Sequence, residues 1–405
     1  MKAQYVAIGS EVLRGTTVNT NSHFISKNLE ELGFSLQRHL AIHDDAQALK
    51  NTIQEALDEF DLSIFSGGLG PTCDDLTKQI ASQAIGYPIV KSEIVHRFLK
   101  EKFPNLKTIE EQSNQIQNAH LFENRIGTAF GFALEKKGKI AIFLPGVPRE
   151  MQEMFLSGVA LFLKEKFEVE KKFSQRFLVL LKREHEVDPF LKQLILKDPS
   201  LSIGIYPNYG FLEVHFASTL NSSLIEAVNA FNAEFEQSIA TESNLLPEAL
   251  LKLLEEKKLK LSVAESCTGG KVSELLTSIS GASNTYLGGV TAYSNESKIN
   301  ILEVDPHILQ SEGAVSQACA IAMTLGVKKI FGSDISISTT GIAGPLGGSS
   351  QKPVGTVFLA ISCQNQTFGF KLPTPSSNKR EIIVSYTANY LLASLYRYLK
   401  FQIIP

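Results

Sequence analysis

Short apolar runs and helical periodicities alternate along the first part of the chain. Apolar runs at residues 4–9 and 62–66 have the length of buried strands, and apolar positions recur at helical spacing over residues 21–32, 46–60 and 76–85. Strands separated by helices in this way form βαβ units, whose parallel strands need right-handed crossovers. The pattern therefore predicts a doubly wound, three-layer α/β domain over residues 1–168.

The pattern changes after residues 167–172, where charged residues outnumber apolar ones. Between residues 172 and 241 it predicts a small α+β domain, in which we find no reactive cluster. We interpret this domain as a spacer or dimerisation module rather than a substrate-contacting one. Its expected elements are strands at 176–181 and on both sides of 206–210, and helices at 189–196 and 223–239.

A third region follows the polar stretch at residues 241–244. It opens with an amphipathic helix at residues 247–257, where Pro247 suits the first turn because the missing N–H costs nothing there. The sequence thus predicts a second three-layer α/β domain over residues 245–405, so the fold class is α/β, with two three-layer domains joined by the α+β unit. Its other expected elements are strands at 260–264, 287–293, 334–339, 355–362 and 367–372, and helices at 317–331 and 379–398.

Composition and charge narrow the range of functions. Apolar residues make up 43% and charged residues 20% of the 405 positions, as in ordinary globular proteins. A net charge of −3 and a pI near 6.3 provide no basic stripe for a phosphate backbone, so direct nucleic-acid binding is not expected. No stretch reaches 18 consecutive apolar residues and no signal-peptide pattern is present, so we expect a cytoplasmic protein without a membrane partner.

The cysteines are too widely spaced to suggest a disulfide framework or a metal site. Cys73, Cys267, Cys319 and Cys363 show no CxxC spacing. Neither a disulfide scaffold nor a zinc knuckle is therefore indicated, and we expect reduced thiols.

A hydroxyl-bearing turn follows the strand expected at residues 260–264. Residues 264–270 read Ala-Glu-Ser-Cys-Thr-Gly-Gly, and ligands of open α/β sheets bind at this end of the strands. Ser266 can present its oxygen to a substrate, while the glycines let N–H groups at a helix N-terminus approach an oxyanion or a phosphate. Ser266 is thus a candidate nucleophile, although such a turn can also merely cap a helix.

A phenol and an amine lie five residues apart after the next expected strand, at Tyr293 and Lys298. A serine hydroxyl cannot attack an amide unless a base accepts its proton. His307 is the only histidine of this region, so Lys298 or Tyr293 must serve as the base. Lys298 then needs a depressed pKa, which burial or a cationic substrate ring would supply. The alternative is that Tyr293 packs in the core and Lys298 is solvated.

A third hydroxyl-rich and glycine-rich loop follows the strand expected at residues 334–339. Thr340 can hydrogen-bond an amide or a phosphate, and Gly341 suits close approach of the backbone to a ligand. Arg380 opens the last helix and can pair with a phosphate, although most arginines simply lie at the surface.

Another glycine-rich stretch follows the strand at residues 62–66 and ends in two acidic residues. Its glycines admit a phosphate or diphosphate, and adjacent carboxylates can hold a divalent cation that bridges phosphate oxygens. Asp75 or Thr72 can instead cap the next helix. The candidate residues of this stretch are Gly67, Gly68, Gly70, Thr72, Asp74 and Asp75.

The C-terminal motifs resemble the CinA C-terminal domain, the nicotinamide mononucleotide deamidase family. The resemblance rests on residues 265–270, Gly-Ala-Ser at 281–283, Tyr293 with Lys298, Gly-Ala-Val-Ser at 313–316, and residues 340–345. It implies hydrolysis of the carboxamide of nicotinamide mononucleotide to nicotinate mononucleotide and ammonia, without a metal or cofactor. It also implies that Ser266 is the nucleophile and that Lys298 and Tyr293 handle its proton. The residues it places around the substrate are Cys267, Thr268, Gly269, Gly270, Thr340, Gly341 and Arg380.

The first 165 or so residues resemble the molybdopterin-binding-type domain found at the CinA N-terminus. Turns at residues 9–11, 19–21 and 144–151 join the glycine-rich stretch in this resemblance. It implies a metal-dependent ADP-ribose pyrophosphatase, in which a divalent cation acts as Lewis acid. Metal or substrate would be bound by Asp74 and Asp75, with Glu11, Asn21, Asp44 and Glu150 as further candidates.

The leading hypothesis is therefore an amidohydrolase acting on nicotinamide mononucleotide, combined with a diphosphatase. The partners expected are small nucleotides such as nicotinamide mononucleotide and ADP-ribose, and a second copy of the chain in a homodimer. Two alternatives stay open. One is a non-catalytic nucleotide-binding or pterin-binding regulatory protein, and the other is a helper in competence or DNA repair.

Overall fold

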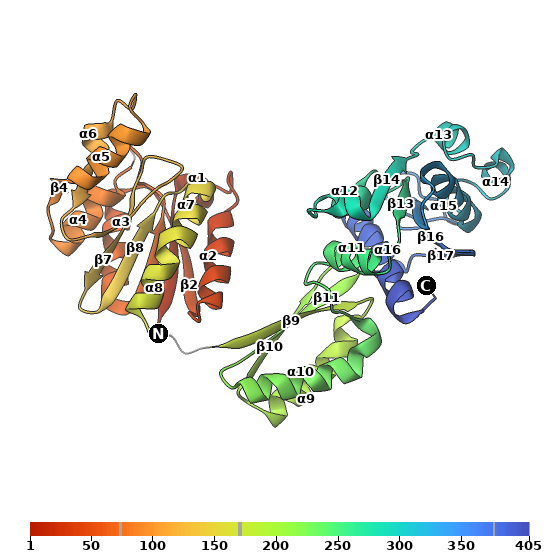
Figure 1. Cartoon of the computed structure of the whole chain (residues 1–405), viewed down its shortest axis with the longest axis horizontal. Helices are drawn as coiled ribbons and strands as arrows, with labels where there is room; N and C mark the ends of the chain where they lie inside the picture. Colours follow the sequence, from red (N-terminus) through yellow and green to blue (C-terminus); the bar gives the residue numbers. More distant parts are fainter. Residues whose placement is uncertain (73–74, 169–171, 376, 405) are drawn as a thin grey trace. The chain divides into compact units, whose positions relative to one another are not determined.

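The computed structural model describes residues 1–72, 75–168, 172–375 and 377–404. The chain divides into two compact units, Met1–Lys171 and Lys172–Pro405 (Figure 1). The division falls in the charged stretch where the sequence pattern changes. The second unit holds both the small α+β part and the C-terminal α/β part.

A six-stranded sheet in the order β2-β1-β3-β8-β7-β6 forms the centre of unit 1. Strands β2, β1, β3 and β8 are parallel to one another, whereas β7 pairs antiparallel with β8, and β6 pairs antiparallel with β7. The sequence pattern predicted parallel strands and did not predict this antiparallel edge. The reason is a two-residue hairpin at Lys137 and Gly138, both with positive φ, which returns the chain directly from β7 to β8. The strands are β1 (Ala3–Ile8), β2 (Leu36–Ile42), β3 (Leu62–Ser66), β6 (His120–Phe122), β7 (Gly131–Lys136) and β8 (Lys139–Leu144).

Helices cover both faces of this sheet, so the expected three layers are confirmed. Along β1, Tyr5 and Ala7 pack on α2, α7 and α8, while Val6 and Ile8 pack on α3 and α4, as the two-residue period of a strand requires. The helices are α1 (Ser10–Leu13), α2 (Thr20–Glu31), α3 (Ala46–Glu59), α4 (Thr77–Ile85), α7 (Pro148–Met154) and α8 (Ala160–Lys166), the last two separated by a short π-helix (Phe155–Val159).

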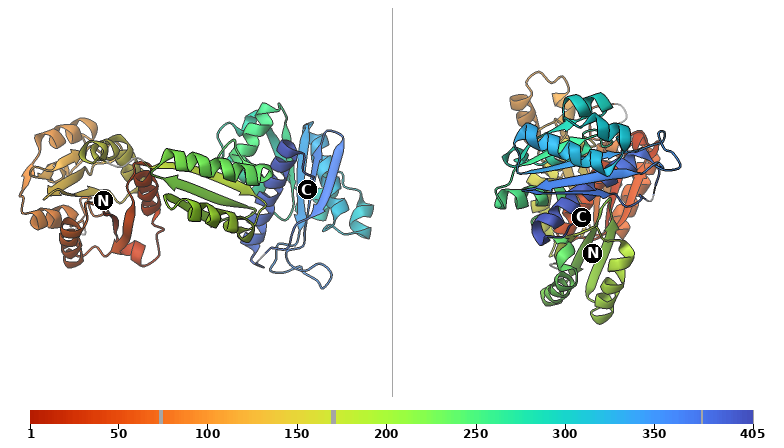
Figure 2. Two further views of the ribbon diagram at one scale, coloured as in Figure 1. Left: turned by 90° about the horizontal axis from the view of Figure 1, so that it is seen from below. Right: turned by 90° about the vertical axis from the view of Figure 1, so that its right-hand side faces the viewer.

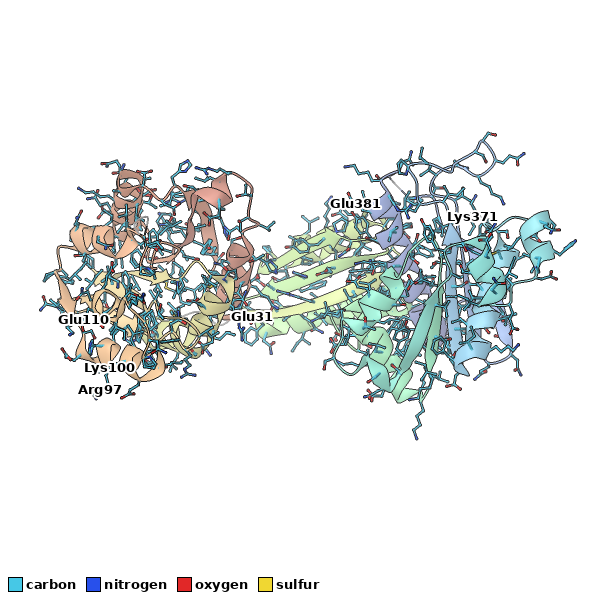
Figure 3. All side chains as sticks on the ribbon, turned by 90° about the horizontal axis from the view of Figure 1, so that it is seen from above. Glu31, Arg97, Lys100, Glu110, Lys371 and Glu381 are labelled. Atoms are coloured by element: carbon cyan, nitrogen blue, oxygen red, sulfur yellow. The ribbon has the colours of Figure 1, made fainter. Side chains whose placement is uncertain are left out.

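A small helical excursion extends from this unit between α4 and β6. Arg97, Lys100 and Glu110 lie on it and project outward (Figure 3). Its elements are β4 (Ile89–Lys91), α5 (Glu93–Lys102), α6 (Ile109–Gln112) and β5 (Asn114–Ile116).

Unit 2 begins with an antiparallel four-stranded sheet in the order β10-β11-β9-β12. Both of its helices lie on one face (Figure 2), where Phe177 and Val214 pack against them. Helix α9 begins at Glu184 rather than at Pro189, because the Glu186 carboxylate accepts a hydrogen bond of 2.8 Å from the Arg183 N–H and starts the helix one turn earlier. The elements are β9 (Phe173–Leu180), α9 (Glu184–Lys197), β10 (Leu201–Pro207), β11 (Phe211–Ser218), α10 (Asn221–Phe235) and β12 (Ile239–Ala240).

The opposite face of this sheet joins the core of the C-terminal part through Leu178 and Leu180. Directly after β12, the Glu242 carboxylate accepts hydrogen bonds from the Tyr396 hydroxyl and, at 2.6 Å, from the Lys400 ammonium. Burial by itself raises the pKa of Glu242, but the hydrogen bonds from Lys400 and Tyr396 outweigh it and the net shift is downward. Glu242 therefore ties the start of the C-terminal part to its last helix.

We expect Glu242→Gln to lower the free energy of unfolding of the chain by about 1–3 kcal/mol at neutral pH, because a half-buried carboxylate that accepts from Tyr396, Lys400 and the Thr241 N–H is lost. The contribution of Glu242 is present above its ordinary pKa of 4.5 and is lost as the pH falls through its lower folded-state value. Urea unfolding at several pH values measures both effects. Glu256→Gln, at an exposed position, is the control, and an equal loss in both variants contradicts the role of Glu242.

The C-terminal part is built on a five-stranded sheet in the order β14-β13-β15-β16-β17. Strands β14, β13 and β15 are parallel, and β16 and β17 are antiparallel. Its elements are α11 (Leu246–Glu256), β13 (Leu261–Glu265), α12 (Lys271–Thr277), β14 (Tyr286–Thr291), α13 (Asn295–Asn300), α14 (Pro306–Ser311), α15 (Gln317–Phe331), β15 (Ile335–Gly341), β16 (Val357–Cys363), β17 (Gln366–Lys371) and α16 (Arg380–Phe401).

Alternation along β15 explains how helices cover both faces. Ile335 and Ile337 pack on the side of α11, α12 and α16. Ser338 faces α15, where its hydroxyl donates to the Ala320 carbonyl at 2.7 Å. A small hydroxyl residue lets that helix approach the sheet closely, so the second three-layer arrangement is confirmed (Figure 1).

The order of these strands creates a topological switch point at β13. The chain passes from β13 to β14 on one side, then crosses to β15 on the other side. In such sheets the carboxyl end of the strand at the switch point lies in a crevice between the flanking loops. Ser266 is the first residue after β13. Within the described ranges, no helix has the length and hydropathy needed to span a lipid bilayer.

Candidate functional site

Ser266 and Lys298 are in direct contact. Ser266 directly follows β13, and Lys298 lies in α13, the short helix that follows β14. The Lys298 Nζ is 3.0 Å from the Ser266 Oγ. Both side chains are buried, with 7% of Ser266 and 2% of Lys298 exposed. The structure thus brings together a hydroxyl and an amine that lie 32 residues apart, and Lys298 is not solvated.

Lys298 has no acidic partner. It forms no ion pair with any described residue, and its other hydrogen bonds run to the carbonyl oxygens of Ala292 at 2.9 Å and Tyr293 at 3.3 Å. Burial lowers the pKa of Lys298 below its ordinary value of 10.5 because the charged form loses hydration. This is the depressed pKa that a lysine base requires.

Three oxygens surround the Lys298 amine. A neutral amine has two N–H donors and one lone pair, whereas an ammonium has three donors. In the structure the amine donates to Ser266 Oγ and to the carbonyls of Ala292 and Tyr293. In the neutral form two N–H groups suffice for the carbonyls, and the lone pair can accept the proton of the Ser266 hydroxyl. The arrangement can therefore activate Ser266 as a nucleophile.

Two backbone N–H groups of the turn after Ser266 have no described carbonyl partner. In the part of the chain that the structure describes, the N–H groups of Cys267 and Thr268 donate to no backbone carbonyl, whereas that of Ser266 donates to Thr339 O at 3.0 Å. Unpaired N–H groups next to a nucleophile can stabilise an oxyanion. Burial raises the pKa of the Cys267 thiol to about 12, so this thiol stays protonated at neutral pH and is a poor rival to Ser266. The described cysteines Cys267, Cys319 and Cys363 are free thiols, and Cys73 lies outside the described residues.

The N-terminus of helix α12 is not open to a ligand, contrary to the expectation from the glycines of this turn. Glu265, which is 1% exposed, accepts hydrogen bonds from the N–H groups of Gly270, Val272 and Ser273. An internal carboxylate thus takes the place that a phosphate was expected to occupy. Sequence reasoning missed this function of Glu265, although an acidic residue at the end of a buried strand signals the need for such a partner.

Tyr293 and Arg380 pair with each other. The Arg380 guanidinium donates to the Tyr293 hydroxyl at 2.9 Å and to the Gly344 carbonyl at 3.0 Å. Arg380 begins α16 next to Glu381, which Figure 3 labels. Tyr293 is 61% exposed, so it does not pack in the core, and its hydroxyl has Arg380 rather than Ser266 as its hydrogen-bond partner.

We expect Tyr293→Phe to lower kcat/KM by no more than about 10-fold, because the Tyr293 hydroxyl contacts Arg380 and not Ser266. Loss of a general base would cost far more, typically 10²–10⁴-fold. Steady-state kinetics of ammonia release measures this effect. Arg380→Gln removes the same pairing from the other side and should give a loss of similar size if the pair acts as a unit. A loss of about 1,000-fold in Tyr293→Phe would instead place the phenol in the proton transfer.

The remaining C-terminal candidates mainly hold the loops around Ser266. The Thr268 and Thr339 hydroxyls lie 2.7 Å apart, and the Thr340 hydroxyl donates to Ala314 O at 2.6 Å. A Cβ on Gly341 would lie 2.8 Å from the Thr356 carbonyl oxygen, so glycine is required there by the neighbouring strand. Gly269 and Gly270 have φ values of 60° and 103°, so the backbone conformation explains why glycine occupies both positions.

The N-terminal candidates line one cavity of about 740 Å³ at the carboxyl ends of β1, β3 and β8. The site therefore forms at the switch point of the first sheet. Asn21 lies in a smaller recess beside it, where its amide donates to Ser66 Oγ and to the Gly146 carbonyl. Asp74 lies outside the described residues. The candidates in the cavity are Glu11, Asp44, Gly67, Gly68, Gly70, Thr72, Asp75 and Glu150.

Neither Asp75 nor Thr72 caps helix α4. The Asp75 carboxylate accepts hydrogen bonds from the N–H of Thr72 at 3.0 Å and from its hydroxyl at 2.5 Å. The residue at the N-cap is Leu76, whose side chain makes no capping hydrogen bond. The capping expectation was wrong because Asp75 closes the preceding loop onto itself.

Four carboxylates and no basic residue line the described part of this cavity. Three of them accept from neutral donors: Asp75 from Thr72, Asp44 from the Ser10 N–H at 2.8 Å and Glu150 from the Asn124 amide at 2.7 Å. Oxygen donors of this kind suit a hard divalent cation. Among the described residues, however, no three acidic, histidine or cysteine side chains form a metal-binding group.

Fold and site together define a two-unit α/β protein with a buried serine and lysine at the second switch point. Residues 243–399 match the family described as CinA C-terminal domain, and residues 4–165 match the family described as probable molybdopterin binding domain. The chain belongs to the CinA family. This agrees with the resemblance drawn from its motifs.

Alignments with named relatives cover nearly the whole chain. A protein of Caldicellulosiruptor bescii, whose name marks it as competence-damage inducible, is 38% identical over 92% of this chain and 93% of its own length. A CinA-like protein of Fervidobacterium nodosum is 34% identical over 95% of this chain and 97% of its own. The solved structure of CinA from Thermoplasma acidophilum, described as a protein with unknown function, is 32% identical, covers 41% of this chain and 98% of that chain, and has a TM-score of 0.38. None of these three descriptions states a reaction.

Proposed function

We propose that this protein is an amidohydrolase that converts nicotinamide mononucleotide to nicotinate mononucleotide and ammonia. The observation that carries the proposal is the 3.0 Å contact between the Ser266 hydroxyl and the buried Lys298 amine. A serine and a neutral lysine are sufficient for acyl transfer from an amide without a metal. The raised pKa of Cys267 supports Ser266 as the nucleophile.

The reaction proceeds through an acyl-enzyme. Lys298 Nζ takes the proton of the Ser266 hydroxyl as Oγ bonds to the carboxamide carbon, and the N–H groups of Cys267 and Thr268 stabilise the oxyanion. The C–N bond then breaks, and ammonia leaves with the proton that Lys298 returns. In the second half, a water attacks the ester while Lys298 takes its proton and passes it to Ser266 Oγ, which releases the acid.

A cationic ring in the substrate suits this site. The pyridinium of nicotinamide mononucleotide carries a positive charge next to the carboxamide, and a nearby cation lowers the pKa of a lysine further. Substrate binding would therefore keep Lys298 in its neutral form. A neutral amide of similar shape would lack this effect.

The test is product analysis with the purified chain in the presence of a metal chelator. We expect equimolar ammonia and nicotinate mononucleotide, and slower turnover of an analogue whose ring is uncharged. No ammonia from nicotinamide mononucleotide, with or without added metal, would reject the proposed function. The chain would then fit a non-catalytic binding protein linked to competence or DNA damage.

We propose as a second function that the N-terminal cavity cleaves the diphosphate of ADP-ribose with a divalent cation. The observation that favours it is the gathering of eight sequence-predicted residues in one cavity. Because the described lining carries four carboxylates and no basic residue, a diphosphate requires a cation to enter it. Release of AMP from ADP-ribose should depend on added Mg²⁺ or Mn²⁺ and persist in Ser266→Ala, and its absence with every divalent cation would reject this activity.

A further inference from the structure

Glu265 satisfies every donor that faces its buried carboxylate. One oxygen accepts from the N–H of Ser273 at 2.8 Å and from its hydroxyl at 2.7 Å. The other accepts from the N–H groups of Gly270 and Val272, each at 3.0 Å. Four short hydrogen bonds to a residue that is 1% exposed fix both ends of the turn that contains Ser266.

The main chain of Glu265 also connects to the base. Its carbonyl accepts a hydrogen bond of 2.8 Å from the Ala292 N–H. The carbonyl of Ala292 in turn accepts from the Lys298 amine at 2.9 Å. The Glu265 side chain therefore fixes the turn that contains Ser266, and the Glu265 backbone fixes Ala292, whose carbonyl accepts the hydrogen bond from Lys298.

We propose that Glu265 is a positioning residue that sets the distance between Ser266 Oγ and Lys298 Nζ. The proposal rests on the amidase function proposed above and adds a residue to it. The negative charge is required because each carboxylate oxygen faces two donors and no acceptor. A carboxamide would turn an NH₂ group toward two donors and push the turn apart.

This role also limits how the substrate binds. Because Glu265 occupies the positive end of α12, a substrate phosphate cannot bind there. The substrate must place its phosphate elsewhere while its carboxamide meets Ser266. The proposal therefore predicts that changes at Glu265 alter kcat much more than KM.

The experiment compares the full-length wild-type chain with Glu265→Gln and Glu274→Gln. Glu274 lies on the same helix but is exposed, and it forms an ion pair with Lys271. We expect Glu265→Gln to lower kcat for nicotinamide mononucleotide by about 100-fold per folded molecule with KM changed less than threefold, since misplacement by about 1 Å costs this much. Glu274→Gln should match the wild type.

Two further measurements keep the outcome decisive. Circular dichroism and thermal unfolding give the folded fraction, because a merely structural residue would change that fraction and leave kcat per folded molecule intact. Ser273→Ala removes one donor while keeping the carboxylate, and it replaces Glu265→Gln if that variant does not fold. A several-fold loss of kcat with unchanged KM in Ser273→Ala supports the proposal, and an unchanged kcat overturns it.

Labelling with a fluorophosphonate separates this proposal from the proposed substrate. The probe reacts with an activated serine regardless of the amide that the enzyme hydrolyses. If the wild type is inactive on nicotinamide mononucleotide but Ser266 is labelled, a slower labelling in Glu265→Gln still supports the positioning role. Labelling rates and kcat equal to those of the wild type in a folded Glu265→Gln chain would overturn the proposal while leaving the amidase function standing.

Discussion

Ser266→Ala is expected to reduce ammonia release from nicotinamide mononucleotide by about 10³-fold or more, since removal of a catalytic nucleophile commonly costs 10⁴–10⁶-fold in kcat. The substitution removes one oxygen from a side chain that is 7% exposed. The fold should therefore persist, and substrate binding should change little. Initial rates with the purified chain, together with substrate binding by calorimetry, measure both quantities.

Ser278→Ala is the matched control because Ser278 is exposed and its hydroxyl donates to the Leu275 carbonyl of its own helix turn. This variant should keep wild-type kinetics. If Ser266→Ala instead retained more than a tenth of the wild-type kcat, the hydroxyl would not be the nucleophile. Direct attack of a water molecule on the carboxamide would then be the mechanism to test.

Lys298→Met is expected to abolish turnover to the same extent as Ser266→Ala. Methionine has a similar length and suits a buried position, but it cannot accept the serine proton. Because the hydroxyl and the amine act as one unit, the double variant should be no slower than either single variant. A further large loss in the double variant would show that the two residues act independently.

The pH dependence gives a second signature of Lys298. Only the neutral amine can act as base, and its folded-state pKa is lowered, so activity should fall as the pH falls through that value. The unfolded chain keeps the ordinary pKa of 10.5. Between 10.5 and the folded-state value, the unfolded state binds more protons, and the wild type should lose about 1.4 kcal/mol of stability for each pH unit of decrease.

Lys298→Met lacks this titration, so its stability relative to the wild type should improve as the pH is lowered through that window. Chemical unfolding of both proteins at several pH values measures the difference. A constant difference across the window would mean that Lys298 is charged when folded. That result would contradict its assignment as the base.

Much of the fold follows from the periodicity of the sequence. The strand at residues 62–66 and the helix at residues 317–331 were predicted with their observed bounds, because apolar alternation and helical spacing are unambiguous there. The start of α9 was missed because it depends on a hydrogen bond between the Glu186 side chain and the Arg183 N–H, which the spacing of apolar residues does not reveal. The antiparallel edge of the first sheet depends on the turn at residues 137–138, which a reading of strands and helices alone overlooks.

The candidate site was predictable in part for similar reasons. Ser266 and Lys298 follow adjacent parallel strands, and the ends of such strands converge, so their contact could be foreseen. The pairing of Tyr293 with Arg380 could not, because it depends on where α16 begins relative to that loop. For Glu265, the end of a buried strand signals that the carboxylate needs partners, but the sequence does not show that these partners are the N–H groups at the start of α12.

Turnover of nicotinamide mononucleotide in the presence of hydroxylamine tests directly whether Ser266 forms an acyl-enzyme with the help of Lys298. Hydroxylamine competes with water for an acyl-enzyme and captures the acyl group as a hydroxamate. We expect the wild type to form the hydroxamate of nicotinate mononucleotide in a proportion that increases with the hydroxylamine concentration, while ammonia is released in an amount equal to the sum of hydroxamate and acid. Formation of the free acid alone at every hydroxylamine concentration would contradict this expectation, because water would then attack the carboxamide directly.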